Sequence, residues 1–571
     1  MVSERNRWRR SRGPRRSRGP RTTRATLIGT LALLAGISVL LFGAFWLVDF
    51  FYLGASTGGG PAGADDPWHL LLAFDPDTLQ NALGSLAQII AAVLGIAITV
   101  VSIVVQLAAN RYTPRVADMF FRDKTNLGVM GFFVVSCINA VWVSLAVSRT
   151  YVPTATVLST VMIVTASLLM LIPYFAYVFD FLDPEKVIDR IGEQTLRNAL
   201  AEARVARTAT GAPAAADTRQ GQTVTSMEQL ADIAVNALSQ KDKVISSDAI
   251  RALRLVIVKY LPEKAGLAPT WFAIGKVLHD NPDFVALAPG SLEDLARDRT
   301  WLEWKGLRQL RGVFVEALKA MPEMAHVVAT ETRYVGEAAL EARDEPVFAL
   351  AVKFMNTYLR AALNARDVRS AYNVLNQYRQ LAEATVRARD AVDLERVGEI
   401  AVRFKYYAQL AQTMGLGFIA ETAAYDLSAL CEVACDHRSP VHESLLGTFL
   451  EIDKEAEDQA QERALRGIRK AQAKLAAYYL LRDMTGSARR IFDDMATESS
   501  ERLRSIRDEL LSITEKDFWE VTDRGTNFDY VDDARKAHLR QFFAWFPSLG
   551  DAAVAASSDR RPDAPHTPIL K

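Results

Sequence analysis

The stretch "AAVLGIAITVVSIVVQLAANRYTPR", residues 91–115, decides what kind of protein this chain forms. The apolar run to which it belongs, residues 86–109, contains no Asp, Glu, Lys, Arg or His. A helix of that length crosses the roughly 30 Å hydrocarbon core of a bilayer, because each residue adds about 1.5 Å. Arg111, Pro114 and Arg115 follow directly. The stretch therefore predicts a membrane-spanning helix that ends in a basic, proline-stopped loop.

Three further apolar runs have the length of a membrane span. They cover residues 26–48, 127–148 and 155–179, and they also lack charged residues and histidine. The first run, "TLIGTLALLAGISVLLFGAFWLV", is longer than the apolar core of a signal peptide and has no small-residue cleavage site, so we interpret it as a retained span. The sequence thus predicts a four-helix transmembrane domain over residues 26–180.

Lysine and arginine in the short loops predict how the spans are oriented. The first 24 residues carry ten Arg and one Glu, a net charge of +9. Residues 49–84 contain no Lys or Arg, whereas residues 110–126 contain four. Because cytoplasmic loops are enriched in these residues, the tail and the second loop are predicted inside and the first loop outside. Four spans then place both termini in the cytoplasm.

The basic tail, residues 1–25, is predicted to be disordered and to bind anionic lipid headgroups, at roughly 1 kcal/mol per basic residue. Nucleic acid is not an expected partner, because neither a helix-turn-helix nor a stacking-aromatic pattern accompanies the tail. The three cysteines, Cys137, Cys431 and Cys435, are too few for an extracellular disulfide framework. The soluble part of the chain is therefore predicted to be cytosolic.

Small and polar residues share one face of the second predicted span. They follow one another at steps of three and four residues: Gln88, Ala92, Gly95, Thr99, Ser102, Gln106 and Ala109. We call this set the polar seam. Helices in lipid associate through small residues and interhelical hydrogen bonds, so the polar seam is predicted to face protein. The third span carries a similar stripe, Gly128, Gly131, Val135, Asn139, Trp142 and Ala146, in which Asn139 is expected to bond Gln106 or Thr99.

Two interpretations of the polar residues stay open. They either hold helices together, or they line a polar pathway made of Gln88, Thr99, Ser102, Gln106 and Asn139. Carriers driven by protons or ions usually keep a titratable group near the midplane of the membrane. The four predicted spans contain none, which disfavours that class of transporter. A neutral, channel-like pathway remains compatible with the sequence.

The end of the second span is predicted to form an interfacial elbow leading to the third span. The residues concerned are Asn110, Tyr112, Thr113, Pro114 and Arg115. Tyrosine suits the headgroup level, threonine is a helix N-cap, and proline is favoured at the first helical position. A short amphipathic helix lying in the membrane plane is therefore expected to begin at Thr113.

These same residues resemble a known family. The match consists of Gln106, Leu107, Ala108, Tyr112, Thr113, Pro114 and Arg115, in which a Gln-Leu-Ala segment ends a span and an aromatic-Thr-Pro-Arg segment follows. This pattern is similar to the bacterial predicted membrane-protein family called domain of unknown function 2254, most clearly over residues 80–150. A later family motif is only partly kept, at Ala237, Leu238 and Ser239. The resemblance implies a bacterial inner-membrane protein without an established activity.

The remaining two thirds of the chain are predicted to be helical. A stalk over 181–207 leads into a flexible linker over 208–226, which is rich in small residues and broken by proline and glycine. Residues 227–547 show amphipathic helical runs and no sustained strand pattern, so the fold class is all-α, with a cytosolic helical bundle or irregular α-solenoid. Residues 548–571 are predicted to be a disordered tail.

Motifs that would indicate chemistry are weak. Cys431, Cys435 and His437 lie close together in "CEVACDH", but a structural zinc site prefers two short-spaced pairs, so we interpret the two cysteines as buried helix residues. "GLGFIA", residues 415–420, imitates a dinucleotide fingerprint in a helical setting that excludes it. No catalytic residue, metal or cofactor is predicted, and an enzyme is not expected.

The function expected from the sequence is that of an oligomeric scaffold or sensor in the inner membrane. Helical surfaces of the predicted cytosolic type usually hold partner proteins or copies of the same chain. A homo-oligomer and a cytosolic protein partner are therefore expected. The alternative is a channel-like protein with a neutral polar pore that the cytosolic domain gates.

Overall fold

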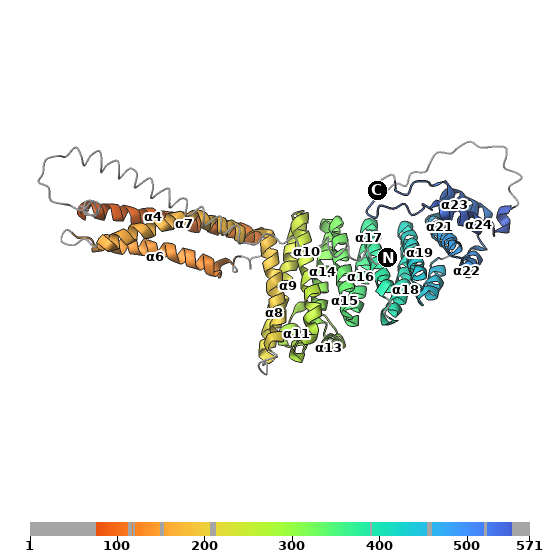
Figure 1. Cartoon of the computed structure of the whole chain (residues 1–571), viewed down its shortest axis with the longest axis horizontal. Helices are drawn as coiled ribbons and strands as arrows, with labels where there is room; N and C mark the ends of the chain where they lie inside the picture. The colour runs from red at the N-terminus through yellow and green to blue at the C-terminus, as the bar shows by residue number, and fades with distance from the viewer. Residues whose placement is uncertain are drawn as a thin grey trace. The chain divides into compact units, whose positions relative to one another are not determined.

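The computed structural model describes residues 76–111, 117, 120–148, 154–205, 213–388, 391–453, 459–518 and 522–550. Helices account for most of these residues, and none of them lies in a β-strand, which confirms the all-α fold class. The chain divides into two compact units, Met1–Val187 and Ile188–Lys571. Figure 1 shows the helices of each unit.

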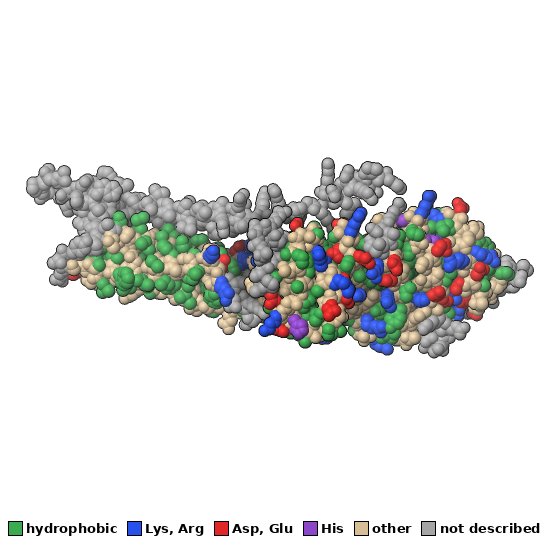
Figure 2. Space-filling view, turned by 90° about the horizontal axis from the view of Figure 1, so that it is seen from below, with side chains coloured by type: hydrophobic (Ala, Val, Ile, Leu, Met, Phe, Trp, Pro, Cys, Tyr) green, Lys and Arg blue, Asp and Glu red, His purple; other side chains and the backbone are tan. Residues whose placement is uncertain are grey.

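The first unit contains helices α4 (Pro76–Arg111), α6 (Lys124–Ala146) and α7 (Thr154–Phe181). Each is long and apolar enough to cross a membrane, in agreement with the second, third and fourth predicted spans. The predicted first span, residues 26–48, and the basic tail lie outside the described residues. Hydrophobic side chains cover the visible surface of this unit (Figure 2). Large exposed residues of this kind include Ile96, Leu107, Trp142 and Leu145.

Helix α4 packs on α6 and α7 through an entirely apolar face. Its buried residues are Leu79, Leu83, Ala87, Ile90, Ala97, Val101, Val105 and Ala108. Leu79 and Leu83 form one cluster with Val143 and Val157, and Ala87 forms another with Ala140 and Val164. Small side chains at the second cluster let the three backbones approach closely. The core of this unit is therefore built from aliphatic residues of all three helices.

Polar side chains join α6 to α7 inside the same unit. The Oγ of Ser167 donates to the Oγ of Ser136 over 2.7 Å, and both residues are buried. The Tyr174 hydroxyl donates to the Asn126 side-chain oxygen over 2.8 Å. These hydrogen bonds satisfy groups that hydrocarbon would otherwise leave without a partner.

The second unit is a long succession of helices. Its longer helices are α8 (Pro184–Val205), α9 (Pro213–Ser239), α10 (Lys243–Tyr260), α14 (Trp301–Ala320), α15 (Ala325–Ala342), α16 (Glu345–Asn364), α17 (Val368–Ala388), α18 (Ala391–Thr413), α19 (Gly417–Asp436), α20 (His442–Leu450), α21 (Gln459–Leu481), α22 (Thr485–Met495), α23 (Ser500–Ser512) and α24 (Asp533–Phe543). Shorter helices are η1 (Leu261–Gly266), η2 (Pro269–Trp271), α11 (Lys276–His279), α12 (Pro282–Val285), α13 (Pro289–Arg297), η3 (Pro322–Met324) and α25 (Pro547–Gly550).

Each long helix in the middle of this unit packs on the next helix and on the next but one. Helix α15 contacts α16 and α17, and α17 contacts α18 and α19. Stacked helical hairpins show this pattern, because each hairpin buries its apolar face against its neighbours. Figure 1 shows the helices from α9 to α19 side by side. The helical character of this unit agrees with the all-α prediction, while the choice between a helical bundle and an irregular α-solenoid stays a prediction.

A recurrent turn separates several of these helices. Lys241, Arg343 and Arg366 each end a helix with a positive φ between 54° and 61°. The residue that follows is an aspartate, Asp242, Asp344 or Asp367, whose carboxylate accepts a hydrogen bond from a backbone N–H of the next helix. One pair of residues thus ends one helix and caps the next. This two-residue turn produces the short connections that a stack of hairpins requires.

The structure corrects one predicted boundary. The flexible linker was predicted over 208–226, but residues 213–226 form the first half of α9. Gln220 in this half is buried, and its Nε2 donates to the carbonyl oxygens of Trp271 and Ala273, each over 2.8 Å. Packing against a distant segment therefore stabilises a helix that the small, polar local sequence does not indicate. The predicted stalk is helical over Pro184–Val205.

Candidate functional site

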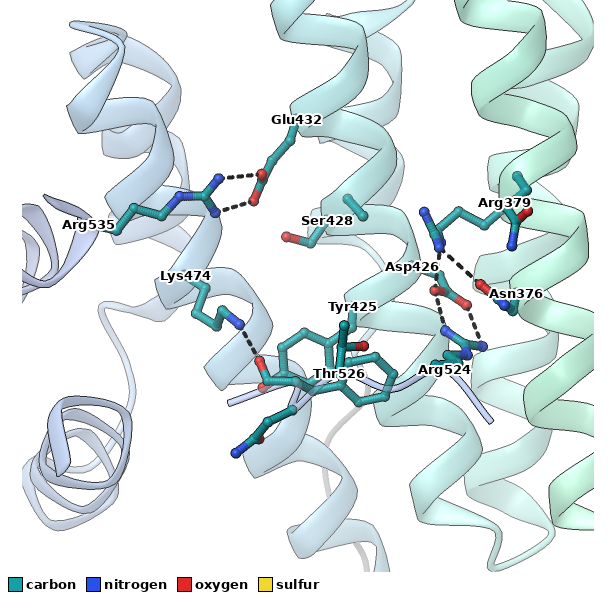
Figure 3. Close-up of a pocket in the computed structure, with 14 residues that line it drawn as sticks. Asn376, Arg379, Tyr425, Asp426, Ser428, Glu432, Lys474, Arg524, Thr526 and Arg535 are labelled. Atoms are coloured by element: carbon teal, nitrogen blue, oxygen red, sulfur yellow. Dashed lines mark hydrogen bonds and ion pairs between the residues drawn. The ribbon is translucent and has the colours of Figure 1, made fainter. Parts of the chain in front are cut away.

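The second unit holds a cavity of about 400 Å³ where four helices meet the segment 522–532. Figure 3 shows its walls. The lining residues come from α17 (Asn376, Arg379, Gln380), α19 (Tyr425, Asp426, Ser428, Ala429, Glu432), α21 (Lys474), the segment 522–532 (Arg524, Thr526, Asn527, Phe528) and α24 (Arg535). Four of these side chains are cationic and two are carboxylates. We call this space the basic cavity.

Arg524 anchors the segment 522–532 to the helices. Its Nη1 and Nη2 donate to the two carboxylate oxygens of Asp426 over 2.7 and 3.2 Å, and Nη2 also donates to the carbonyl of Tyr372. The guanidinium carbon lies 4.0 Å from the centre of the Tyr372 ring. Planar guanidinium groups suit this combination of bidentate pairing and stacking. Arg524 is 5% exposed, so a buried charge pair closes one side of the cavity.

Arg379 and Arg535 frame the cavity from two other helices. The Nε of Arg379 lies 3.1 Å from Asp426, which therefore faces two guanidinium groups. Arg535 pairs bidentately with Glu432, with distances of 2.8 and 2.7 Å from its two Nη atoms to the carboxylate oxygens. Figure 3 shows both pairs. Both carboxylates of the lining are thus already engaged by arginine.

Lys474 is the fourth cation of the lining. Its Nζ donates to the carbonyl of Phe528 and lies 5.3 Å from the centre of the Tyr425 ring. Within the part of the chain that the structure describes, no carboxylate lies within ion-pair distance of this nitrogen. Burial lowers the pKa of Lys474 to about 8, although Asp529 and Glu432 oppose this shift. The ammonium group is therefore incompletely compensated.

Aromatic rings hold the segment 522–532 against α19. The rings of Tyr425 and Phe528 stack with a centroid distance of 4.8 Å and an angle of 13° between their planes. The Tyr425 hydroxyl donates to Asp529 over 2.6 Å. Asp529 also lies 2.7 Å from the Nζ of Lys470 on α21. The segment is thus fixed on both sides of its aromatic contact.

A second charged group lies behind the cavity. Lys470 is 2.7 Å from Asp529 and 3.6 Å from Glu421. Burial raises the pKa of Glu421 to about 7, because the attraction of Lys470 only partly offsets the loss of water. This carboxyl group lies directly against Gly467, where a Cβ atom would come within 2.4 Å of it. The glycine therefore permits the close approach of α19 and α21.

The structure places the polar seam on the exposed face of α4. Gln88, Thr99, Ser102 and Gln106 are all exposed, and a Cβ at Gly95 would meet no atom within 4 Å. The prediction that the polar seam packs on the third span of the same chain is therefore wrong. The apolar face of α4 packs there, because aliphatic side chains interlock with those of α6 and α7 without leaving polar groups in the contact.

The expected partner of Asn139 is also corrected. Its Nδ2 donates to the Oγ1 of Thr160 on α7 over 3.0 Å, rather than to Gln106 or Thr99. Several members of the stripe predicted on the third span, including Val135 and Trp142, are exposed. Asn139 therefore does serve as a hydrogen-bonded helix contact, but with the fourth predicted span.

The predicted elbow lies mostly outside the described residues. Asn110 falls within α4, whereas Tyr112, Thr113, Pro114 and Arg115 are not described. The chain beyond the elbow is well anchored. Asp123 caps α6 by accepting hydrogen bonds from the backbone N–H groups of Thr125 and Asn126 and from the Tyr177 hydroxyl. Burial by itself would raise the pKa of Asp123. The hydrogen bonds that its carboxylate accepts outweigh burial and lower the pKa below its ordinary value.

The cysteines occupy helix positions. Cys431 is fully buried, and the Sγ of Cys435 contacts the Sδ of Met484 over 3.1 Å. The Nε2 of His442 lies 2.8 Å from the Tyr479 hydroxyl. Among the residues whose placement is described, no group of three His, Cys, Asp or Glu side chains could hold a metal ion.

The basic cavity was not predicted from the sequence. Its residues extend from Asn376 to Arg535, and no short motif joins them. Asp426 and Arg524 are 98 positions apart, so only the stacking of the helices brings them together. The one local signal is the polar, glycine-containing segment "DRGTNFDY", residues 523–530, between amphipathic helices.

A comparison with protein families bears on the first unit. Residues 23–229 match the family described as a predicted membrane protein, DUF2254. The chain carries a DUF2254 region. The resemblance inferred from the second span and its loop is therefore confirmed. The DUF2254 match ends within α9 and leaves the basic cavity outside it. No curated protein and no solved structure matches the chain.

Proposed function

We propose that this membrane protein is an oligomeric sensor or scaffold, in which copies associate through the polar seam of α4 and the second unit engages a ligand or partner. The observation that carries the proposal is the exposure of Gln88, Thr99, Ser102 and Gln106 along one face of a membrane-spanning helix. Polar side chains that face hydrocarbon are costly, and association of helices removes that cost.

The packing inside the chain supports this interpretation. Helices α6 and α7 already use the pairs Asn139–Thr160 and Ser136–Ser167 to hold together. The seam of α4 offers the same residue types with small neighbours at Ala92 and Gly95, where backbones can approach closely. A second copy presenting the same seam is chemically self-complementary, because each Gln side chain can both donate and accept.

The second unit supports the sensor or scaffold part of the proposal. Stacked helical hairpins present extended surfaces that usually bind other proteins. Charged side chains crowd the visible surface of this unit (Figure 2). The basic cavity gives it a ligand-sized space at the junction of four helices. The proposal assigns no catalytic role to any residue.

The alternative function is a channel. In that case the exposed polar groups of α4 line a neutral pathway between copies, and the second unit gates it. The same side chains support both functions, so a flux measurement has to distinguish them. Gln106→Leu together with Ser102→Leu should abolish flux while leaving the oligomer intact if the residues line a pore, and should weaken the oligomer if they are packing contacts.

We further propose the bacterial inner membrane as the location, with both termini in the cytoplasm. The distribution of Lys and Arg between residues 49–84 and 110–126 supports this topology. The basic residues 1–25 would then face the anionic inner leaflet. Labelling of single cysteines in intact cells and in lysed cells, one placed at Ser56 and one at Ser558, tests the topology: only Ser56→Cys should react before lysis.

Cysteine cross-linking in membranes tests the association. In a chain with Cys137 replaced by Ala, Ser102→Cys is expected to form a disulfide-linked dimer after mild oxidation. Ile103→Cys is the matched control, because Ile103 is also exposed but lies on the neighbouring face of α4. Equal cross-linking at both positions, or none at Ser102, would contradict the proposed seam contact. Cross-linking of Ser102→Cys to a cysteine at Ser38 of the same chain would assign the seam to the first predicted span instead.

A further inference from the structure

We propose that the basic cavity binds a small dianion, of the phosphate-ester or dicarboxylate type. This site lies in the second unit and outside the residues that match the membrane-protein family. Its use as the input of a sensor rests on the proposed function, whereas the binding itself does not. Three features of the cavity favour an anion: the charge of its lining, the fixed guanidinium group of Arg524 and the availability of Lys474.

The charge of the lining favours an anion. Arg379, Arg524, Arg535 and Lys474 contribute four positive charges, and Asp426 and Glu432 contribute two negative charges. Within the lining the cations exceed the carboxylates by two, although Glu383 and Asp532, outside the lining, also pair with Arg379 and Arg535. Lys474 is the cation of the lining that has no carboxylate partner within the described residues. A dianion neutralises the excess within the lining, because its charge is attracted to the cations around it.

Arg524 provides the second observation. Its Nε is buried and has no hydrogen-bond partner among the residues that the structure describes. A buried N–H of a guanidinium group is rarely left without an acceptor. Arg524 lines the cavity and is held in place by Asp426 on its Nη atoms. The Nε itself is covered by protein atoms, so Arg524 contributes to the cavity through its charge, which Asp426 holds in a fixed position.

Lys474 supplies further donors. Its ammonium group carries three protons, of which the contact with the Phe528 carbonyl uses one. The Tyr425 ring lies beside it at 5.3 Å, and no carboxylate compensates it directly within the described segments. An anion beside Lys474 would therefore gain charge-assisted hydrogen bonds without displacing an existing ion pair.

The size of the cavity limits the ligand. A volume of about 400 Å³ lies near the lower end of small-molecule sites. Tyr425 and Phe528 add an aromatic wall, while Ser428, Thr526 and Asn527 add neutral polar groups. The space thus accommodates one anionic head with a short organic group.

Titration calorimetry of the purified full-length chain in detergent tests the inference. The probes are inorganic phosphate and succinate, with chloride as the monoanion control at constant ionic strength. Binding of at least one dianion with one site per chain is expected, and Lys474→Met should weaken it about tenfold, the loss of one charged contact. Lys319→Met removes a lysine that is exposed and outside the cavity, and it should leave the affinity unchanged.

A second pair of variants keeps the test independent of Lys474. Ala429 lines the cavity from α19. Ala429→Asp adds a negative charge there and should abolish dianion binding, whereas Ala429→Asn adds nearly the same volume without charge and should retain it. A circular-dichroism melting curve of each variant confirms that it is folded.

The inference would be overturned by an absence of binding of both dianions at about 10 mM, or by binding that Lys474→Met and Ala429→Asp leave unchanged. Dianion binding is measured on the detergent-solubilised chain, whereas the seam contact is measured by cross-linking in membranes. Failure of one proposal is therefore distinguishable from failure of the other.

Discussion

Asp426 of α19 accepts hydrogen bonds from both Nη atoms of Arg524, at 2.7 and 3.2 Å, and also lies 3.1 Å from the Nε of Arg379. One buried carboxylate thus joins α17, α19 and the segment 522–532. Asp426 is 3% exposed, and Arg524 is 5% exposed. The shape of the basic cavity depends on this junction.

Replacing Asp426 by Asn should strongly destabilise the second unit. The substitution keeps the size of the side chain but leaves two guanidinium groups without their shared negative charge, and breaking a buried pair costs about 3–5 kcal/mol. Urea unfolding followed by far-ultraviolet circular dichroism measures the loss. Asp493→Asn, at an exposed pair with Arg489, is the control and should change stability by less than about 1 kcal/mol. Equal midpoints for the two variants would refute the prediction.

The hydrogen bond between Asn139 and Thr160 should contribute measurably to the packing of α6 on α7. We expect a coupling energy of about 0.6–2 kcal/mol between Asn139→Leu and Thr160→Val in a double-mutant cycle. Unfolding in mixed micelles of increasing SDS content provides the measurement. Ser144→Ala, which removes a bond within α6 to the Val141 carbonyl, should show no coupling to Thr160→Val. A zero coupling energy for Asn139 would mean that the contact is energetically neutral.

Arg366→Gly should raise the free energy of unfolding. Arg366 has a φ of 54° and is exposed, so glycine removes the cost of the left-handed conformation without removing a buried contact. The greater freedom of glycine in the unfolded chain offsets part of the gain, which leaves about 0.5–1 kcal/mol. Chemical denaturation measures the change. Arg366→Ala keeps the backbone cost and should not be stabilising; a stabilisation equal to that of glycine would contradict the explanation.

The stability of the second unit should depend on the ionisation of Glu421. Its pKa is raised from 4.5 to about 7 in the folded chain, so the folded state holds a proton that the unfolded state releases first. The free energy of unfolding must therefore fall as pH rises from 4.5 to about 7. The groups that face Glu421 are Lys470, Asp529 and Glu509.

Glu421→Gln should flatten this part of the pH profile. We expect the difference between the two profiles to reach about 1–3 kcal/mol across the window, because one pKa unit corresponds to about 1.4 kcal/mol. Lys470 keeps Asp529 and Glu509 as partners, so the variant should still fold. Denaturation at a series of pH values measures both profiles. Parallel profiles for the original chain and the variant would show that Glu421 does not titrate in this range.

Sequence patterns were sufficient to predict the membrane helices α4, α6 and α7, because the apolar composition of a span is a local property of the sequence. A span must be apolar over its whole length, and residues 86–109 satisfy that requirement whatever lies beside them. The same patterns failed to say which face of α4 packs inside the chain. Small polar residues and aliphatic residues are both used in helix contacts, so the choice between Ser102 and Val101 depends on the shape of α6 and α7.

In the second unit, too, the local sequence predicted most helices, whereas contacts between distant segments decided the rest. Amphipathic periodicity predicted helices over most of residues 227–547, yet it missed the first half of α9, where Gln220 gains its partners only from the distant Trp271 and Ala273. The sequence by itself determined three of the predicted membrane spans, the all-α class and the family resemblance. The tertiary structure alone decided where the polar seam points and that Asp426 meets Arg524, because these depend on the packing of side chains that are far apart along the chain.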